Sequence, residues 1–234
     1  MKDLSGTVAL VTGGAVGTEL AHAFLAEGAS VAMLFRNPLR AGRIGDEFSG
    51  SPERFKAIQA DLSSYQQSSD AVAKAKNSFG KIDFLLNSLG GWVGGKKLHE
   101  HEASELSRML DMDVIPTFNV MSAVLPGMME RRSGKIINFV SMQVFGTGEG
   151  NAVYAASKSA VLALTRAAAA EYRQYGISVF GIAPSIIDTE ANRKSMRDAD
   201  TSKWVTVGEI ADAILFLCKA GDPMSGTILK FLAR

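Results

Sequence analysis

The stretch VALVTGGAVG, residues 8–17, decides the fold of this chain. Its first four residues are apolar and β-branched at both ends, a pattern typical of a short buried strand. The glycines that follow predict a tight turn, after which Leu20, Ala21, Phe24 and Leu25 recur at the spacing of a helix. The stretch therefore predicts a strand, a glycine-rich turn and a helix in that order.

The same alternation continues along the rest of the chain. Apolar runs predict further strands at 30–35, 55–59, 82–86, 135–140, 177–181 and 227–231, and helical stretches lie at 103–131 and 152–175. Strands that alternate with helices form parallel βαβ units, so the series predicts an α/β fold with a doubly wound parallel sheet of about seven strands. No segment rich in proline, glycine or serine divides the chain, and we therefore predict a single domain over residues 1–234.

The composition is that of an ordinary globular protein. Hydrophobic residues make up 47% and charged residues 21%, and the net charge of +1 gives no reason to expect nucleic acid or an anionic membrane as a partner. Neither a signal peptide nor a run approaching about 18 apolar residues is visible, which predicts a cytoplasmic protein.

Cysteine and histidine give no sign of a metal site. The single cysteine, Cys218, lies in an apolar stretch and is predicted to be a buried helix residue. His99 and His101 have no convincing partner ligand in the sequence, so we expect them to be solvated and expect no bound metal.

The glycine turn at residues 12–17 predicts a dinucleotide site. Glycines such as Gly13 and Gly17 let the backbone approach a pyrophosphate, which the free N–H groups of the helix N-terminus attract. The second strand is followed by Arg36, with no acidic residue before Asp46 to bind the adenosine ribose of NAD(H). Arg36 is either an ordinary surface arginine or the partner of a 2′-phosphate, and we predict NADP(H) as the preferred cofactor with NAD(H) as the alternative.

Tyr154 and Lys158 form a candidate catalytic pair. They lie four residues apart, which places a phenol and an ammonium on one face of a helix. A nearby cation stabilises the phenolate, so the pair predicts a Tyr154 pKa below its usual value of about 10. Such a tyrosine exchanges a proton with a carbonyl or alcohol oxygen, whereas the bland alternative is a solvated helix pair.

Five motifs, in the order found here, resemble those of the short-chain dehydrogenase/reductases over essentially the whole chain. They are the glycine turn at 12–17, Ala60-Asp61-Leu62, Asn87-Ser88-Leu89-Gly90, Ser141 thirteen residues before the pair Tyr154 and Lys158, and Ala183-Pro184-Ser185 followed by Ile187-Asp188-Thr189. The resemblance implies a Rossmann-type fold and an NAD(P)-dependent oxidoreductase.

The resemblance also implies roles for individual residues. Ser141, Tyr154 and Lys158 match the catalytic residues, and Asp113 stands where the family's catalytic tetrad has asparagine. A hydride would pass between nicotinamide and a carbonyl or alcohol substrate, whose oxygen Ser141 holds and Tyr154 protonates. Lys158 would bind the nicotinamide ribose. The cofactor contacts, with Gly13, Gly17 and Arg36 included, would be completed by Asp61, Leu62, Asn87, Gly90, Tyr154, Lys158, Pro184 and Thr189.

The chain departs from the family pattern at three positions of the site. Glu19 replaces the third glycine of the turn, and Ser185 replaces a glycine that follows the proline. Asp113 introduces a charge that would alter the proton path. Glu19 and Asp113 favour an alternative in which the chain is a catalytically silent, dinucleotide-binding regulatory protein.

The substrate subgroup stays open. Residues 90–95 and 188–196 are similar to quinonoid dihydropteridine reductases, whereas residues 128–137 resemble the 3-oxoacyl-carrier-protein reductases. A dihydropteridine reductase-like enzyme is therefore a further alternative to a general carbonyl reductase.

Two segments are expected to surround the substrate, and one helix to join subunits. Trp92 either stacks on a flat or apolar substrate or merely covers the core. A short lid at 190–206 is rich in basic residues, which indicates an open site, an anionic substrate group or solvated loop charge. The helix at 152–175 is apolar around much of its circumference, which together with the family resemblance predicts a homodimer or homotetramer.

Overall fold

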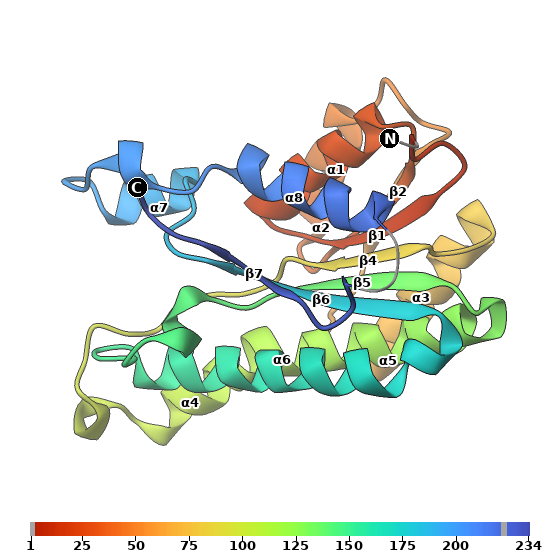
Figure 1. The fold of residues 1–234 in the computed structure, drawn as a ribbon. Helices are drawn as coiled ribbons and strands as arrows, with labels where there is room; N and C mark the ends of the chain where they lie inside the picture. Colours follow the sequence, from red (N-terminus) through yellow and green to blue (C-terminus); the bar gives the residue numbers. More distant parts are fainter. Residues whose placement is uncertain (1–2, 221–223) are drawn as a thin grey trace.

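The protein is built around one parallel sheet (Figure 1). A computed structural model describes residues 3–220 and 224–234, with the side chains of 40 and 41 left aside. The seven strands lie in the order β3-β2-β1-β4-β5-β6-β7. They are β1 (Val8–Thr12), β2 (Ser30–Phe35), β3 (Phe55–Gln59), β4 (Phe84–Asn87), β5 (Gly134–Phe139), β6 (Ile177–Pro184) and β7 (Ile228–Phe231). The predicted doubly wound single-domain α/β fold is confirmed.

Helices cover both faces of the sheet (Figure 1). One face carries α1 (Ala15–Ala26), α2 (Pro38–Glu47) and α8 (Val207–Lys219); the other carries α3 (Tyr65–Phe79), α4 (Ala103–Met109), α5 (Ile115–Arg131) and α6 (Ala152–Glu171). The short α7 (Glu190–Ser195) lies beyond the carboxyl end of β6. None of the helices in the described ranges is both long enough and apolar enough to cross a membrane.

The strands are buried on both faces, so their apolar residues divide between two clusters. Ala9 and Val11 of β1 pack with α1 and α8, whereas Leu10 between them packs with α3 and α5. This alternation follows from the two-residue period of a strand. Phe24 and Leu10 are fully buried, and each such side chain stabilises the fold by about 1.5–3 kcal/mol.

The long helical stretch predicted at 103–131 is interrupted. A π-helical turn at Leu110–Val114 separates α4 from α5. This wider turn of helix contains the buried Asp113. π-Helical turns of this kind are frequent at functional sites.

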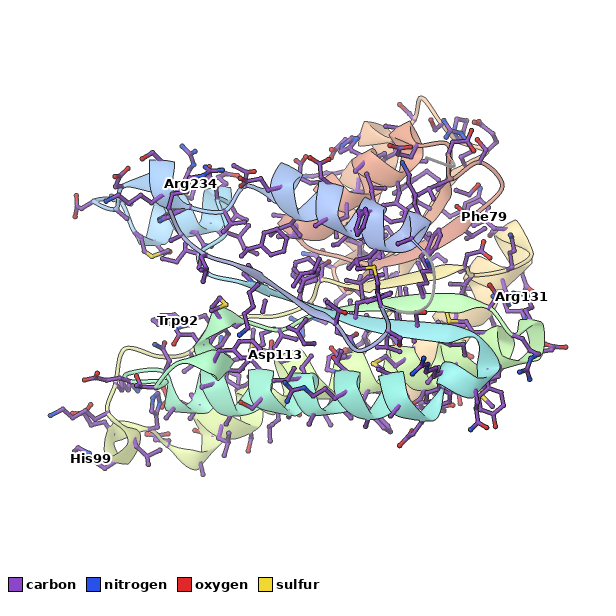
Figure 2. All side chains as sticks on the ribbon, in the orientation of Figure 1. Phe79, Trp92, His99, Asp113, Arg131 and Arg234 are labelled. Atoms are coloured by element: carbon purple, nitrogen blue, oxygen red, sulfur yellow. The ribbon has the colours of Figure 1, made fainter. Side chains whose placement is uncertain are left out.

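The prediction for the burial of Cys218 is confirmed, whereas the prediction for the exposure of His101 is wrong. Cys218 is buried in α8 as predicted, and burial raises the pKa of its thiol to about 12. The expectation of a solvated His101 is wrong, because its side chain is only 3% exposed and its Nδ1 lies 2.9 Å from the Glu105 carboxylate. His99 is exposed at the tip of the loop that precedes α4 (Figure 2).

Candidate active site

The first turn of the fold forms a cradle of bare backbone. A Cβ added to Gly13 would lie 2.5 Å from the carbonyl oxygen of Leu34, and one added to Gly17 would collide with the carbonyl oxygen of Thr12. Gly14 has a φ of 139°, which favours glycine. No side chain caps the N-terminus of α1, so its first N–H groups remain available to an anion. The turn therefore fits the pyrophosphate of a dinucleotide.

A cavity of about 360 Å³ extends from this turn over the carboxyl ends of the neighbouring strands. Its lining includes the predicted cofactor residues Gly13, Arg36, Asp61, Leu62 and Gly90. Hydrogen bonds from Ser63, and to a lesser extent the nearby Arg36, lower the pKa of Asp61. The cavity thus places a guanidinium and a carboxylate beside the glycine turn.

Ser141 and Tyr154 meet at the carboxyl end of β5. Ser141 follows β5, and its Oγ accepts a hydrogen bond from the Gln143 N–H at 3.2 Å. Ser141 also hydrogen-bonds the Tyr154 phenol, which lowers the tyrosine pKa. Burial acts the other way and is the larger effect, so the pKa of Tyr154 lies above its ordinary value.

Lys158 and Asp113 form a buried ion pair beneath Tyr154. The Lys158 Nζ lies 3.5 Å from Asp113 Oδ1, with side-chain exposures of 5% and 0%. The same ammonium donates to the carbonyl oxygens of Phe139 at 3.3 Å and Leu89 at 3.5 Å. Burial lowers the pKa of Lys158, and the Asp113 carboxylate partly opposes that shift.

Asp113 also joins two segments of the site. Its Oδ2 accepts the Ser157 hydroxyl at 2.7 Å, and its Oδ1 accepts the Gly91 N–H at 3.2 Å. The carboxylate thereby links α6 to the loop at 90–95. Ser157 was not among the predicted site residues, and since 44 positions separate it from Asp113, no local sequence pattern relates the two.

The predicted lowering of the Tyr154 pKa is wrong for the protein without a bound cofactor. The Lys158 Nζ lies 6.0 Å from the centroid of the Tyr154 ring, whereas it is much closer to a carboxylate. Asp113 offsets the positive charge of Lys158 and by its own charge raises the tyrosine pKa. The phenol is accordingly neutral near pH 7, which is the form that donates a proton.

Gly90 lies against the predicted catalytic residue Lys158, and Asn87 is buried three residues before it. Asn87 is 1% exposed, and its Nδ2 donates to Asn138 Oδ1 at 2.9 Å, while its own Oδ1 has no protein partner. A Cβ at Gly90 would lie 2.7 Å from the Lys158 Nζ. A side chain at position 90 would therefore displace the lysine ammonium from its present position.

Pro184 and Thr189 lie at the carboxyl end of β6. Pro184 ends the strand and is buried, and the Ser185 Oγ that follows is buried without a hydrogen-bond partner among the described residues. Thr189 caps α7 by accepting the Asn192 N–H at 3.2 Å. It lines a second cavity, together with Glu19 of α1.

Trp92 does not cover the core. Its side chain is 62% exposed, and its indole N–H donates to Asn151 Oδ1 at 2.9 Å. Asn151 directly precedes α6, and a second bond from the Gly95 N–H to the Gly150 oxygen at 2.7 Å holds the same two segments together. Trp92 lies at the same end of the sheet as Asp113 (Figure 2).

Most basic residues of the segment at 190–206 have acidic partners. Arg193 makes two bonds to Asp188, at 2.5 and 2.7 Å. Lys194 pairs with Glu190 at 2.5 Å, and Lys203 pairs with Asp200 at 3.6 Å. Of the three readings of this segment, solvated loop charge fits these pairs best.

The fold and this arrangement define the class of the protein. A parallel sheet with a glycine cradle at its first turn, and a serine, a tyrosine and a lysine gathered beside it, is typical of oxidoreductases that bind a nicotinamide dinucleotide. The family model described as short chain dehydrogenase matches residues 7–200. The chain belongs to this family and is an NAD(P)-dependent oxidoreductase.

Relatives agree with this assignment over nearly the full chain. Oxidoreductase UcpA from Salmonella typhimurium is 33% identical over 242 aligned positions, covering 100% of this chain and 89% of the relative. The structure of ElxO with NADP bound matches with a TM-score of 0.90 and 26% identity, covering 96% of each chain. A gluconate 5-dehydrogenase from Burkholderia cenocepacia, in complex with NADP and tartrate, matches with a TM-score of 0.86 and 29% identity, covering 97% of this chain and 94% of the other.

Proposed function

We propose that this protein is an NADP(H)-dependent reductase that transfers a hydride between nicotinamide and a carbonyl or alcohol substrate. The observation that carries the proposal is the group formed by Ser141, Tyr154 and Lys158 around the buried Asp113. Burying a lysine and its carboxylate partner costs desolvation energy. An enzyme gains catalysis from such a pair, whereas a catalytically silent regulatory protein would gain nothing from it.

The preference for NADP(H) rests on Arg36. This guanidinium follows β2 and lines the cavity beside the glycine turn. It matches the 2′-phosphate, since arginine binds phosphate through two parallel hydrogen bonds. The bound NADP in the ElxO structure and in the gluconate 5-dehydrogenase structure supports this choice.

The remaining cofactor contacts follow the shape of the site. Gly13 and Gly17 would receive the pyrophosphate, and Asp61 and Leu62 the adenine. Lys158 would bind the nicotinamide ribose. Asn87, Gly90, Pro184 and Thr189 would complete the nicotinamide end, under a lid at 190–206.

When bound, a nicotinamide cofactor would supply the hydride for the carbonyl carbon. Ser141 donates a hydrogen bond to the carbonyl oxygen and thus stabilises the negative charge that develops there. Tyr154, neutral at pH 7, donates its proton to the same oxygen. The Asp113 carboxylate favours the charged form of Lys158, and that ammonium would stabilise the phenolate that remains.

The test is turnover by the Tyr154→Phe variant. NADPH oxidation would be followed with simple ketones, a β-ketoacyl thioester and a quinonoid dihydropterin, which also separates the substrate subgroups. We expect Tyr154→Phe to lose about 10²–10⁴-fold in kcat, the usual contribution of a general acid, with NADPH affinity nearly unchanged. Retention of most activity in this variant would disprove the role of Tyr154.

We also propose that the protein is a homodimer or homotetramer. Large apolar side chains stay exposed on the outer face of α4 and α5, namely Leu106 at 37%, Ile115 at 38% and Phe118 at 50%. Ala163 and Ala167 of α6 are exposed as well. An apolar face of this kind is typical of a subunit interface, and sedimentation or light scattering would give the oligomeric state.

A further inference from the structure

An exposed lysine lies near the carboxyl end of the last strand, outside the residues assigned above. Lys230 is the second-to-last residue of β7. It pairs in register with Ala183, the second-to-last residue of β6. Leu229 and Phe231, on either side of it, pack into the cluster beneath α1 and α8. Because side chains alternate along a strand, Lys230 extends toward the opposite face, which carries α6.

The Lys230 ammonium is held over an aromatic ring. Its Nζ lies 3.9 Å from the centroid of the Phe145 ring. Phe145 ends the 3-10 turn Met142–Phe145, which begins directly after Ser141. The cation–π contact therefore holds a positive charge against the turn that follows Ser141, the residue proposed to bind the carbonyl oxygen.

Within residues 3–220 and 224–234, this charge has no acidic partner. Arg193, Lys194 and Lys203 are each paired with a carboxylate. Among the residues that the structure describes, no carboxylate lies within 4.0 Å of the Lys230 Nζ. An aromatic face does not neutralise the ammonium, and the N–H donors that point away from the ring can bind an anion.

The anion is not the phosphate at the adenosine end of the cofactor. Five spacings between strands separate β2, which positions Arg36, from β7 in the sheet order. At about 4.8 Å for each spacing, Lys230 lies roughly 24 Å from the adenosine end. It lies instead beyond β6, on the side of Ser141.

We propose that Lys230 binds a carboxylate of the substrate, so that the enzyme acts on oxo acids and the corresponding hydroxy acids. The inference rests on the proposed function and names its substrate class. In the reduction, a hydride adds to the carbonyl carbon while the C=O double bond becomes a C–O single bond. The oxygen takes the Tyr154 proton, and NADPH is oxidised to NADP⁺. Lys230 takes no part in bond making and only positions the acid.

The test compares acids with their neutral esters. The wild type and the variants Lys230→Met and Lys230→Arg would be assayed with pyruvate, acetoacetate and levulinate, whose carboxylates stand at increasing distances from the ketone, and with the three methyl esters. Lys56→Met is the matched control, because Lys56 is an exposed lysine on the opposite edge strand, β3.

We expect the wild type to prefer one acid over its ester, and Lys230→Met to lose about 10- to 100-fold in kcat/KM for that acid only. Lys230→Arg should retain the preference, and Lys56→Met should behave as the wild type. Equal activity on acids and esters in the wild type, or an equal loss on both in Lys230→Met, would overturn the inference while leaving the proposed function intact. Reduction of no carbonyl compound at all would overturn the proposed function itself.

Discussion

The Asp113 carboxylate and the Lys158 ammonium lie 3.5 Å apart with almost no exposure to water. The carboxylate also accepts hydrogen bonds from the Ser157 hydroxyl and the Gly91 N–H, so each of its oxygens has a hydrogen-bond donor. Desolvation makes a buried pair of this kind poor evidence for stability, but loss of one partner leaves the other charge buried and unpaired. Asp113 therefore favours the charged form of Lys158 in the folded protein, against the effect of burial.

Asp113→Asn should destabilise the protein at pH 7. The amide retains much of the shape and some hydrogen bonding, but it no longer balances the ammonium. We expect the free energy of unfolding to fall by up to about 3 kcal/mol, measured by urea denaturation. An unchanged value would mean that the pair contributes nothing to folding.

The same variant should lose less stability as the pH rises. Burial lowers the pKa of Lys158 and Asp113 raises it, so removing the carboxylate lowers this pKa further. Between the lowered folded pKa and the unfolded value of about 10.4, only the unfolded chain holds the proton, and stability rises with pH. The gap between wild type and variant should thus narrow from pH 7 toward pH 10. A gap that widens would contradict a charged Lys158 in the folded protein.

Arg36→Ala should separate the two cofactors. Loss of a guanidinium that binds the 2′-phosphate weakens NADPH binding by about 10- to 100-fold but leaves NADH, which lacks that phosphate, nearly unaffected. Titration by nicotinamide fluorescence measures both dissociation constants. Equal weakening of the two cofactors would assign Arg36 to adenine stacking or to the fold instead.

The fold was predictable because its signals are local. The two-residue period of the strands and the glycine turn at 12–17 fall within short windows, and all seven predicted strands are present. The bounds were less well predicted: β4 begins at Phe84, two residues after the predicted start, and the Asp83 side chain before it accepts the Val8 N–H at 2.8 Å. β6 continues to Pro184, the last residue that pairs with β7.

Only the residues of the site that lie within sequence motifs could be predicted. The resemblance pointed to Ser141, Tyr154 and Lys158, yet the ionisation of the tyrosine depends on Asp113, which arrives from a distant segment. His101 was misjudged for the same reason, since its burial depends on packing that no short window contains. The bond between Trp92 and Asn151 spans 59 positions and had no sequence signal.

Two glycine variants should act in opposite directions. Gly17→Ala places a methyl group against the Thr12 carbonyl oxygen, and overpacking of this kind costs about 1–3 kcal/mol. Gly45→Ala, in α2, meets nothing within 4 Å and should stabilise the protein by about 0.5–1 kcal/mol through its helix propensity. Only Gly17→Ala should also weaken NADPH binding. Thermal unfolding and fluorescence titration of both variants test the pair, and equal NADPH affinity in both would remove Gly17 from the cofactor site.

Trp92→Phe should reduce turnover without changing cofactor binding. The substitution keeps an aromatic ring but removes the N–H that donates to Asn151, the residue that precedes α6. An exposed hydrogen bond contributes about 0.5–1.5 kcal/mol, so kcat/KM should fall by roughly 2- to 12-fold as the loop at 90–95 loosens from the helix that carries Tyr154.

A double-mutant cycle decides whether this bond is the cause. Asn151→Ala removes the acceptor of the same bond and should produce a similar loss. If the bond positions Tyr154, the double variant Trp92→Phe, Asn151→Ala should be no worse than either single one, because one interaction cannot be lost twice. Additive losses in kcat/KM would mean that the two residues act separately, with Trp92 then contacting the substrate through its exposed ring.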